Sequence, residues 1–171
     1  SSLFRKTLYR GTSYNRHLGI DWSGLASSNS GLIRSENKKG DFESNFEQGM
    51  EIFKGCEAIS YCGTAEEPFR VKKSKFGSFA LCFSGNIINH QEIVNDFDQA
   101  NHIFETGESA EALAKLIVQG DNFTDGIKKM AARVKGAYSL LLLTKEGIYA
   151  VCCPGGYWPL IIGGHRKFRA V

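Results

Sequence analysis

The sequence predicts an α+β domain built from two stacked sheets with helices on the outside. Three observations support this class: strand-like segments recur through the first half, amphipathic helices follow them, and the last third is strand-like throughout. Strands grouped before and after a block of helices fit two sheets packed around a core and covered by helices. A chain of 171 residues is long enough to bury such a core as one domain.

The first half is expected to contain a helix end, short strands and one full helix. Residues 3–9 carry an apolar stripe that ends at Gly11, a residue typical of the position just past a helix. Residues 41–53 have apolar side chains spaced for one helical face. The Ser/Gly-rich stretch 24–30 is expected to turn, and 63–75 is expected to be irregular. The strands expected here are 17–22, 31–34 and 56–62.

A strand, turn and helix over residues 76–97 are expected to organise the rest of the fold. The first part, 76–83, is a nearly continuous apolar run, typical of a strand buried on both faces. Residues 84–86 interrupt the run, and Gly85 can adopt backbone angles that a Cβ disfavours. Asn89 then stands where a helix cap is expected. Backbone N–H groups at such a strand end could hold a ligand oxyanion.

The second half is expected to contain two helices and then strands only. The helices are 109–119, with Ser109 as its N-cap and Gly120 as its stop, and 124–134. The expected strands are apolar runs separated by Gly and Pro turns: 136–144, 147–153, 158–162 and 168–171.

The composition argues against several functional classes. A net charge of +3 is too small to indicate nucleic-acid binding, and no apolar stretch approaches the ~20 residues of a membrane-spanning helix. The five cysteines form no C-x-x-C pair and the histidines have no metal-ligand spacing, so neither a metal site nor a cofactor is expected. Reduced, buried thiols are typical of a cytoplasmic protein.

Six short blocks resemble the class II glutamine amidotransferases, and among them most closely the glutaminase domains of amidophosphoribosyltransferases. One block reads Phe-Ser-Gly-Asn-Ile-Ile-Asn, where the family has His-Asn-Gly-Asn-(Leu/Ile)-x-Asn. Another reads Lys-Gly-Ala-Tyr-Ser, almost unaltered from the family pattern. The blocks follow the family's order: 8–11, 18–20, 83–89, 104–111, 135–139 and 153–160.

The resemblance implies a fold and a chemistry. The fold is the N-terminal-nucleophile hydrolase fold, a four-layer α-β-β-α sandwich of two mainly antiparallel sheets. In the chemistry, the amine of an N-terminal cysteine acts as base while its thiol attacks the glutamine amide. No residue here matches that cysteine, because the sequence begins with Ser1 and Ser2 already inside the expected first helix, so the nucleophile is expected upstream. Residues 1–171 are therefore expected to be a single domain, truncated at both ends, of a longer chain.

The resemblance also shows which glutamine-site positions have changed. Gly63, followed by Thr64, stands at the position of an arginine that binds the substrate α-carboxylate. Ser84, before the retained Gly85, replaces an oxyanion-hole asparagine, and Ser109 replaces an aspartate that pairs with the α-ammonium. Each charge-assisted bond contributes roughly 1.5–3 kcal/mol, so losing both charge partners should weaken glutamine binding by orders of magnitude.

Two arginines bear on this expectation. Arg10 is retained from the family, where the resemblance implies that it supports the site, although it could equally cap its helix. Arg70 could replace the lost arginine, but no pattern places it there.

Losing the oxyanion donor at position 84 would cost about a hundredfold to a thousandfold in rate.

These residues predict a glutamine amidotransferase-like domain without glutaminase activity, acting as a structural, regulatory or ligand-binding module. One alternative is an active glutaminase with its cysteine upstream, which feeds ammonia to an attached synthase or phosphoribosyltransferase domain. Another is a hydrolase of a different amide, because such a substrate would not need the lost charges. The expected partners are an attached domain, a small amide ligand and further copies of the full-length protein, but neither nucleic acid nor a membrane.

Overall fold

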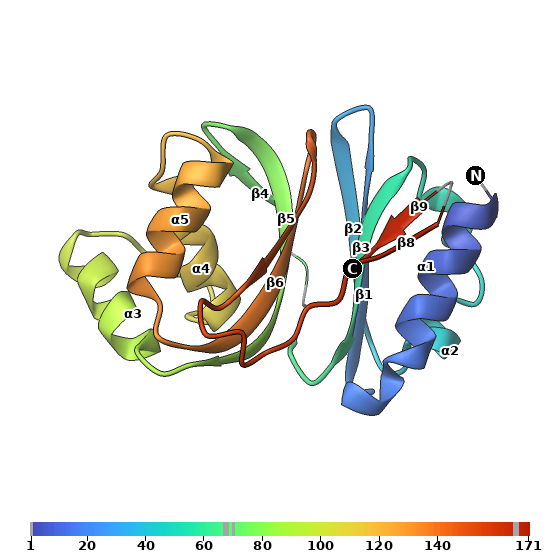
Figure 1. The fold of residues 1–171 in the computed structure, drawn as a ribbon, viewed down its shortest axis with the longest axis horizontal. Coiled ribbons are helices and arrows are strands. Elements are labelled where there is room, and N and C mark those ends of the chain that lie inside the picture. The colour runs from blue at the N-terminus through green and yellow to red at the C-terminus, as the bar shows by residue number, and fades with distance from the viewer. Residues whose placement is uncertain (1, 67–68, 70, 166–167) are drawn as a thin grey trace. The chain divides into compact units, whose positions relative to one another are not determined.

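The computed structural model describes residues 2–66, 69, 71–165 and 168–171, and it confirms the α+β class (Figure 1). Among the described residues, the strands form sheets of order β2-β1-β3 and β4-β5-β6-β7, and a β8-β9 pair. The chain divides into two compact units. The first contains residues 1–82 and 141–149, and the second contains 83–140 and 150–171.

The first unit holds a three-stranded antiparallel sheet with helices on one face. β1 lies between β2 and β3 and pairs antiparallel with both. α1 and α2 pack on this sheet, where aromatic side chains of the α2 region fill a core around Leu25 and Cys62. The elements are α1 (Ser2–Tyr14), η1 (Arg16–Leu18), β1 (Trp22–Asn29), β2 (Leu32–Lys39), α2 (Phe42–Phe46), η2 (Met50–Ile52), β3 (Glu57–Gly63) and β4 (Val71–Ser74).

The other face of the three-stranded sheet packs against the second sheet within the same unit. Ala26 and Ile59 share a buried cluster with Ala80, Cys82 and Leu143. Ala80 and Cys82 belong to β5 (Gly77–Ile87), and Leu143 belongs to β6 (Gly136–Thr144). The predicted stacking of two mainly antiparallel sheets is therefore present in this unit.

Several predicted boundaries in the first unit are wrong. α1 does not stop at Gly11 but continues to Tyr14. Residues 24–29 of the predicted turn 24–30 belong to β1, because their small side chains fit a strand that is covered on both faces. The turn is Ser30-Gly31, with φ of +52° and +82°, as in a two-residue hairpin.

Three more predictions for this unit need correction. The predicted strand 17–22 is mostly η1 and loop, and only Trp22 joins β1. The predicted helix 41–53 breaks at Gly49, where φ is +91°. The stretch predicted as irregular contains β4, which pairs with β5 as a short hairpin.

The second unit carries three helices beside the ends of β5 and β6. α4 and α5 pack against each other and lie along these strands (Figure 1). Residues 84–86 do not end β5, which runs on through Gly85 to Ile87. The remaining elements are α3 (His90–Gln99), α4 (Ser109–Val118), α5 (Phe123–Arg133), β7 (Gly147–Cys152), β8 (Gly163–His165) and β9 (Phe168–Ala170).

The helix caps and the C-terminal strands differ in detail from the prediction. Asn89 precedes α3 as predicted, but its side chain accepts from Lys135 N and donates to Arg133 O instead of capping the helix. Ser109 is the first residue of α4 and not its cap, which is Glu108. The predicted strand 158–162 is not a strand, and β8 forms after it.

Candidate functional site

Gly85 holds β5 close to β6. Its φ is +127°, and a Cβ there would lie 2.2 Å from the Ala137 carbonyl oxygen and 2.7 Å from Tyr138 Cα. Across the same pair of strands, a Cβ on Gly136 would lie 2.1 Å from the carbonyl oxygen of Asn86. All three distances are far below any normal contact, so only glycine fits at positions 85 and 136. The retained Gly85 is therefore explained by backbone packing alone.

Ser84 is engaged by another residue that departs from the family pattern. The Trp158 indole N–H donates to the Ser84 hydroxyl at 3.2 Å. The family block that residues 153–160 resemble reads Asp-Pro-x-Gly-x-Arg-Pro-Leu, which implies an arginine at position 158. The resemblance also implies an asparagine at position 84, so the two replacements contact each other. The Ser84 hydroxyl thus accepts a structural hydrogen bond where the family has an oxyanion donor.

The loop that carries Trp158 is closed around a buried cysteine. Cys153 N donates to the Tyr138 carbonyl oxygen at 2.9 Å, and Gly156 N donates to the Cys153 carbonyl oxygen at 2.9 Å. Hydrogen bonds from the backbone at Tyr138 and then at 156–158 lower the pKa of the Cys153 thiol against the opposing effect of burial. The backbone of this loop therefore surrounds the Cys153 sulfur.

Tyr61 fills the space beside Gly63. A Cβ on Gly63 would lie 2.2 Å from the Tyr61 hydroxyl and 2.5 Å from its Cζ. Residues 61 and 63 are two apart on β3, so their side chains share one face of the strand. The tyrosine therefore occupies the room that an arginine at position 63 would need.

The Tyr61 side chain is fixed at both ends. Its ring packs against the cluster that contains Ile59 and Cys82, and its hydroxyl accepts from Ala65 N at 3.1 Å. Burial raises the pKa of Tyr61, an effect that the Ala65 hydrogen bond partly opposes. The phenol is thus neutral and integrated into the fold.

The backbone around Gly63 is also crowded from another side. A Cβ on Gly19, where φ is +147°, would lie 2.7 Å from Gly63 Cα and 3.2 Å from Thr64 N. Thr64 itself is exposed. Further along, the Asn37 side chain donates to Phe69 O and accepts from Phe69 N at 2.9 Å. The two Asn37 hydrogen bonds tie Phe69 to β2.

Of the two arginines considered above, the structure describes only Arg10. Arg10 is an exposed residue of α1, inside the helix and not at its end, so it does not cap that helix. Arg70 lies outside the described residues, so the prediction about it stays open.

Ser109 is uncharged where the resemblance places an aspartate. Glu111, two residues later, has a carboxylate that binds the backbone before α4. Glu111 is 6% exposed, and its carboxylate accepts from Glu105 N at 2.8 Å, from Thr106 N at 2.8 Å and from Gly107 N at 3.3 Å. Burial raises the pKa of Glu111, but these hydrogen bonds outweigh it and lower the pKa to about 2. The loop before α4 is therefore held by the Glu111 carboxylate.

In the structure, two of the changed positions each have a local partner. Tyr61 lies beside Gly63, and Trp158 donates a hydrogen bond to Ser84. Sequence reasoning missed both partners. A tyrosine two residues before a strand glycine could have indicated the first, whereas Trp158 gave no such signal. Within the described residues, no group of three His, Cys, Asp or Glu side chains is arranged to hold a metal ion. In the same part of the chain, no helix is both long and apolar enough to cross a membrane.

Comparisons with known proteins find glutamine amidotransferase relatives. Residues 58–170 match the family model described as a glutamine amidotransferase domain. The amidophosphoribosyltransferase of Methanocaldococcus jannaschii is 28% identical over 92% of this chain and 36% of that protein. That of Bacillus subtilis is 28% identical over 91% of this chain and 35% of its own length. The chain thus spans about a third of these relatives.

Solved structures agree as well. The B. subtilis glutamine phosphoribosylpyrophosphate amidotransferase complexed with ADP and GMP matches with a TM-score of 0.85 and 25% identity. The match covers 95% of this chain and 38% of that one. A structure of the allosteric regulatory enzyme of purine biosynthesis matches with a TM-score of 0.82 and 25% identity. These matches confirm the N-terminal-nucleophile hydrolase fold, and the chain belongs to the glutamine amidotransferase domain family.

Proposed function

We propose that this domain no longer binds or hydrolyses glutamine and serves as a structural or regulatory module of a longer protein. The observation that carries the proposal is the position of Tyr61. At the place where the resemblance puts a carboxylate-binding arginine, there is a glycine whose side-chain space the tyrosine fills. A restored arginine would first have to displace a half-buried ring that packs against the core.

Two further observations support the proposal. The Ser84 hydroxyl accepts the Trp158 indole N–H at the position where the resemblance places the oxyanion donor. The loop before α4 keeps Glu111, which holds its backbone, but has an uncharged Ser109 where the resemblance places the ammonium partner. The contacts that maintain the fold are retained, whereas the groups that would bind substrate are not.

The longer protein is itself part of the proposal. Relatives of this chain are almost three times as long and are named amidophosphoribosyltransferases, so we propose an attached synthase or phosphoribosyltransferase domain. In such a protein the domain would contribute contacts or bind an effector rather than supply ammonia.

The test is a glutaminase assay of the intact protein that contains this domain. We expect glutamate to form from glutamine at the uncatalysed rate, while B. subtilis amidophosphoribosyltransferase under the same conditions serves as the active control. Glutamate release that Ser84→Ala lowers would contradict the proposal and support an active glutaminase. Hydrolysis of another amide with the same sensitivity would support the different hydrolase.

A further inference from the structure

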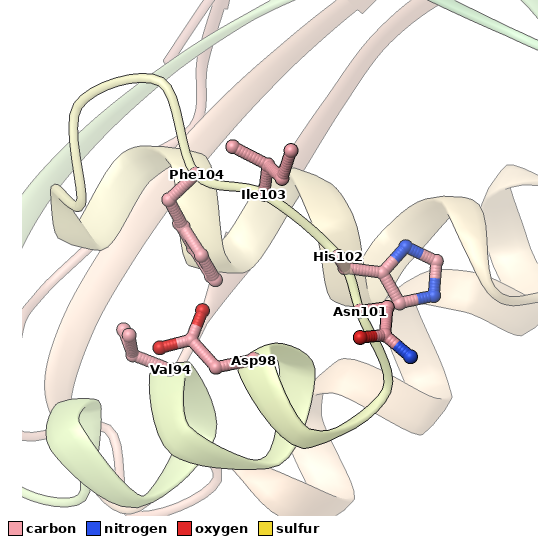
Figure 2. Close-up of a pocket in the computed structure, with 6 residues that line it drawn as sticks. All are labelled: Val94, Asp98, Asn101, His102, Ile103 and Phe104. Carbon is pink, nitrogen blue, oxygen red and sulfur yellow. The ribbon is translucent and has the colours of Figure 1, made fainter.

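An open hollow lies at the end of α3, and none of the glutamine-site positions lines it. It has a volume of about 480 Å³. Figure 2 shows the Asp98 carboxylate directed toward the Phe104 ring, with the Val94 side chain beside it. Ile103 forms another edge and is 86% exposed, so its apolar side chain is open to a ligand. The hollow thus combines apolar walls with one carboxylate.

The walls are held in place by the way α3 ends. Asn101 has φ of +58° and donates through its N–H to Asp98 O at 3.0 Å, while His102 N donates to Phe97 O at 2.9 Å. This pattern is the Schellman motif, which satisfies the last carbonyl groups of a helix. Lys115 Nζ donates to Ile103 O at 2.8 Å and fixes the next residue. The hollow is therefore preorganised, which lowers the entropic cost of filling it.

Asp98 is an uncompensated negative charge. It lies in the last turn of α3, where the helix dipole is negative and disfavours a carboxylate, and that turn has no basic residue. Asp96 in the same turn is paired with Arg133. Asp98 has no ion pair with any described residue, so the free carboxylate and the helix end together attract a cation.

The nearby basic side chains, Lys115 and His102, do not pair with the Asp98 carboxylate. Lys115 lies 5.0 Å from the Phe104 ring centre, but its ammonium is held by the Ile103 carbonyl and by Glu111 at 3.8 Å. The His102 ring packs edge-on against Phe97 and points away from Asp98 in Figure 2. The charge at Asp98 therefore remains available to a ligand.

We propose that this hollow binds a small organic cation, an ammonium group on a short hydrocarbon stem. The ammonium pairs with the Asp98 carboxylate, and the methylene groups of the stem contact Val94, Ile103 and Phe104. An amino group of a free amine and a lysine side chain of a peptide share this chemistry. Exposed ion pairs are weak, so binding is expected in the millimolar range.

Saturation-transfer NMR on the intact protein tests the proposal, because the method detects weak ligands of large proteins. The probes are pentylamine, its uncharged counterpart 1-pentanol, and N-acetyl-lysine-methylamide as the peptide form. We expect pentylamine to bind at least about fivefold more tightly than pentanol, the factor that corresponds to an ion pair of about 1 kcal/mol. The tighter of the two amines identifies the source of the ligand.

Two variants of α3 provide a matched comparison. Asp98→Asn should remove the preference for pentylamine over pentanol, whereas Asp96→Asn, which alters the paired carboxylate of the same turn, should leave it unchanged. Equal binding of pentylamine and pentanol by the unaltered protein would overturn the proposal, and so would a preference that survives Asp98→Asn. Neither result depends on glutamine hydrolysis, so the proposed function is tested separately.

Discussion

At the scale of single residues, glycine at position 85 is required by its neighbours as well as by its φ. Gly85→Ala places a Cβ against the backbone of β6, so we expect a loss of about 2–4 kcal/mol of unfolding free energy. Gly107 is the matched control, because its φ is +69° but nothing lies within 4 Å of its Cβ position. Gly107→Ala should cost only about 1 kcal/mol. Urea unfolding measures both, and equal losses would mean that the contact with β6 has no effect.

Also at the scale of single residues, the lowered pKa of Glu111 predicts that the unfolding free energy depends on pH. Its pKa is about 2 in the folded state against an ordinary 4.5, so the folded state favours the ionised form. The stability that it contributes, about 3 kcal/mol, is fully present above pH 4.5 and is lost as pH falls toward 2.

Unfolding free energies measured from pH 6 to pH 2 check this expectation. Glu111→Gln should be less stable than the unaltered chain at pH 6 and should lack this part of the acid dependence. Glu108→Gln, which changes an exposed carboxyl of the same loop, serves as the control. If the unaltered chain and Glu111→Gln lost stability in parallel, the carboxylate would not hold the loop.

At the scale of elements, Asn37 ties Phe69 to β2 with its side-chain amide. Asn37→Ala leaves both backbone groups of Phe69 without these partners and should cost about 1–3 kcal/mol. Asn37→Asp can still accept from Phe69 N but cannot donate to its carbonyl, so an intermediate loss is expected. Hydrogen exchange at the Phe69 amide reports the effect directly: unchanged protection in Asn37→Ala would show that the pair does not hold the segment.

The elements also show what could be predicted from the sequence. α4 and β6 were predicted because their apolar residues repeat with helical spacing or form a continuous run. β1 was missed because Ser27 and its small neighbours are common in turns, and their burial depends on chain segments packed over both faces. At the site, the changed positions were found from the family blocks. The Tyr61 ring beside Gly63 and the Trp158–Ser84 bond were not, because they depend on side-chain packing.

At the scale of the whole molecule, we propose that the fold has been kept while the residues that would recognise glutamine have been replaced. Tight backbone contacts at Gly85 and the carboxylate of Glu111 maintain the domain. Tyr61 and Trp158 engage two of the changed positions. Because these contacts stabilise the fold, the domain gains from them even if it has no glutamine to bind.

Calorimetric titration of the intact protein with glutamine tests this central claim most directly. We expect no binding up to millimolar glutamine, and none after Gly63→Arg alone, because Tyr61 blocks the new side chain. The triple variant Tyr61→His, Gly63→Arg and Ser109→Asp removes the block and restores both charge partners, so it should regain measurable binding. Millimolar or tighter binding by the unaltered protein, weakened by Ser109→Ala, would contradict the claim that the glutamine site has been lost.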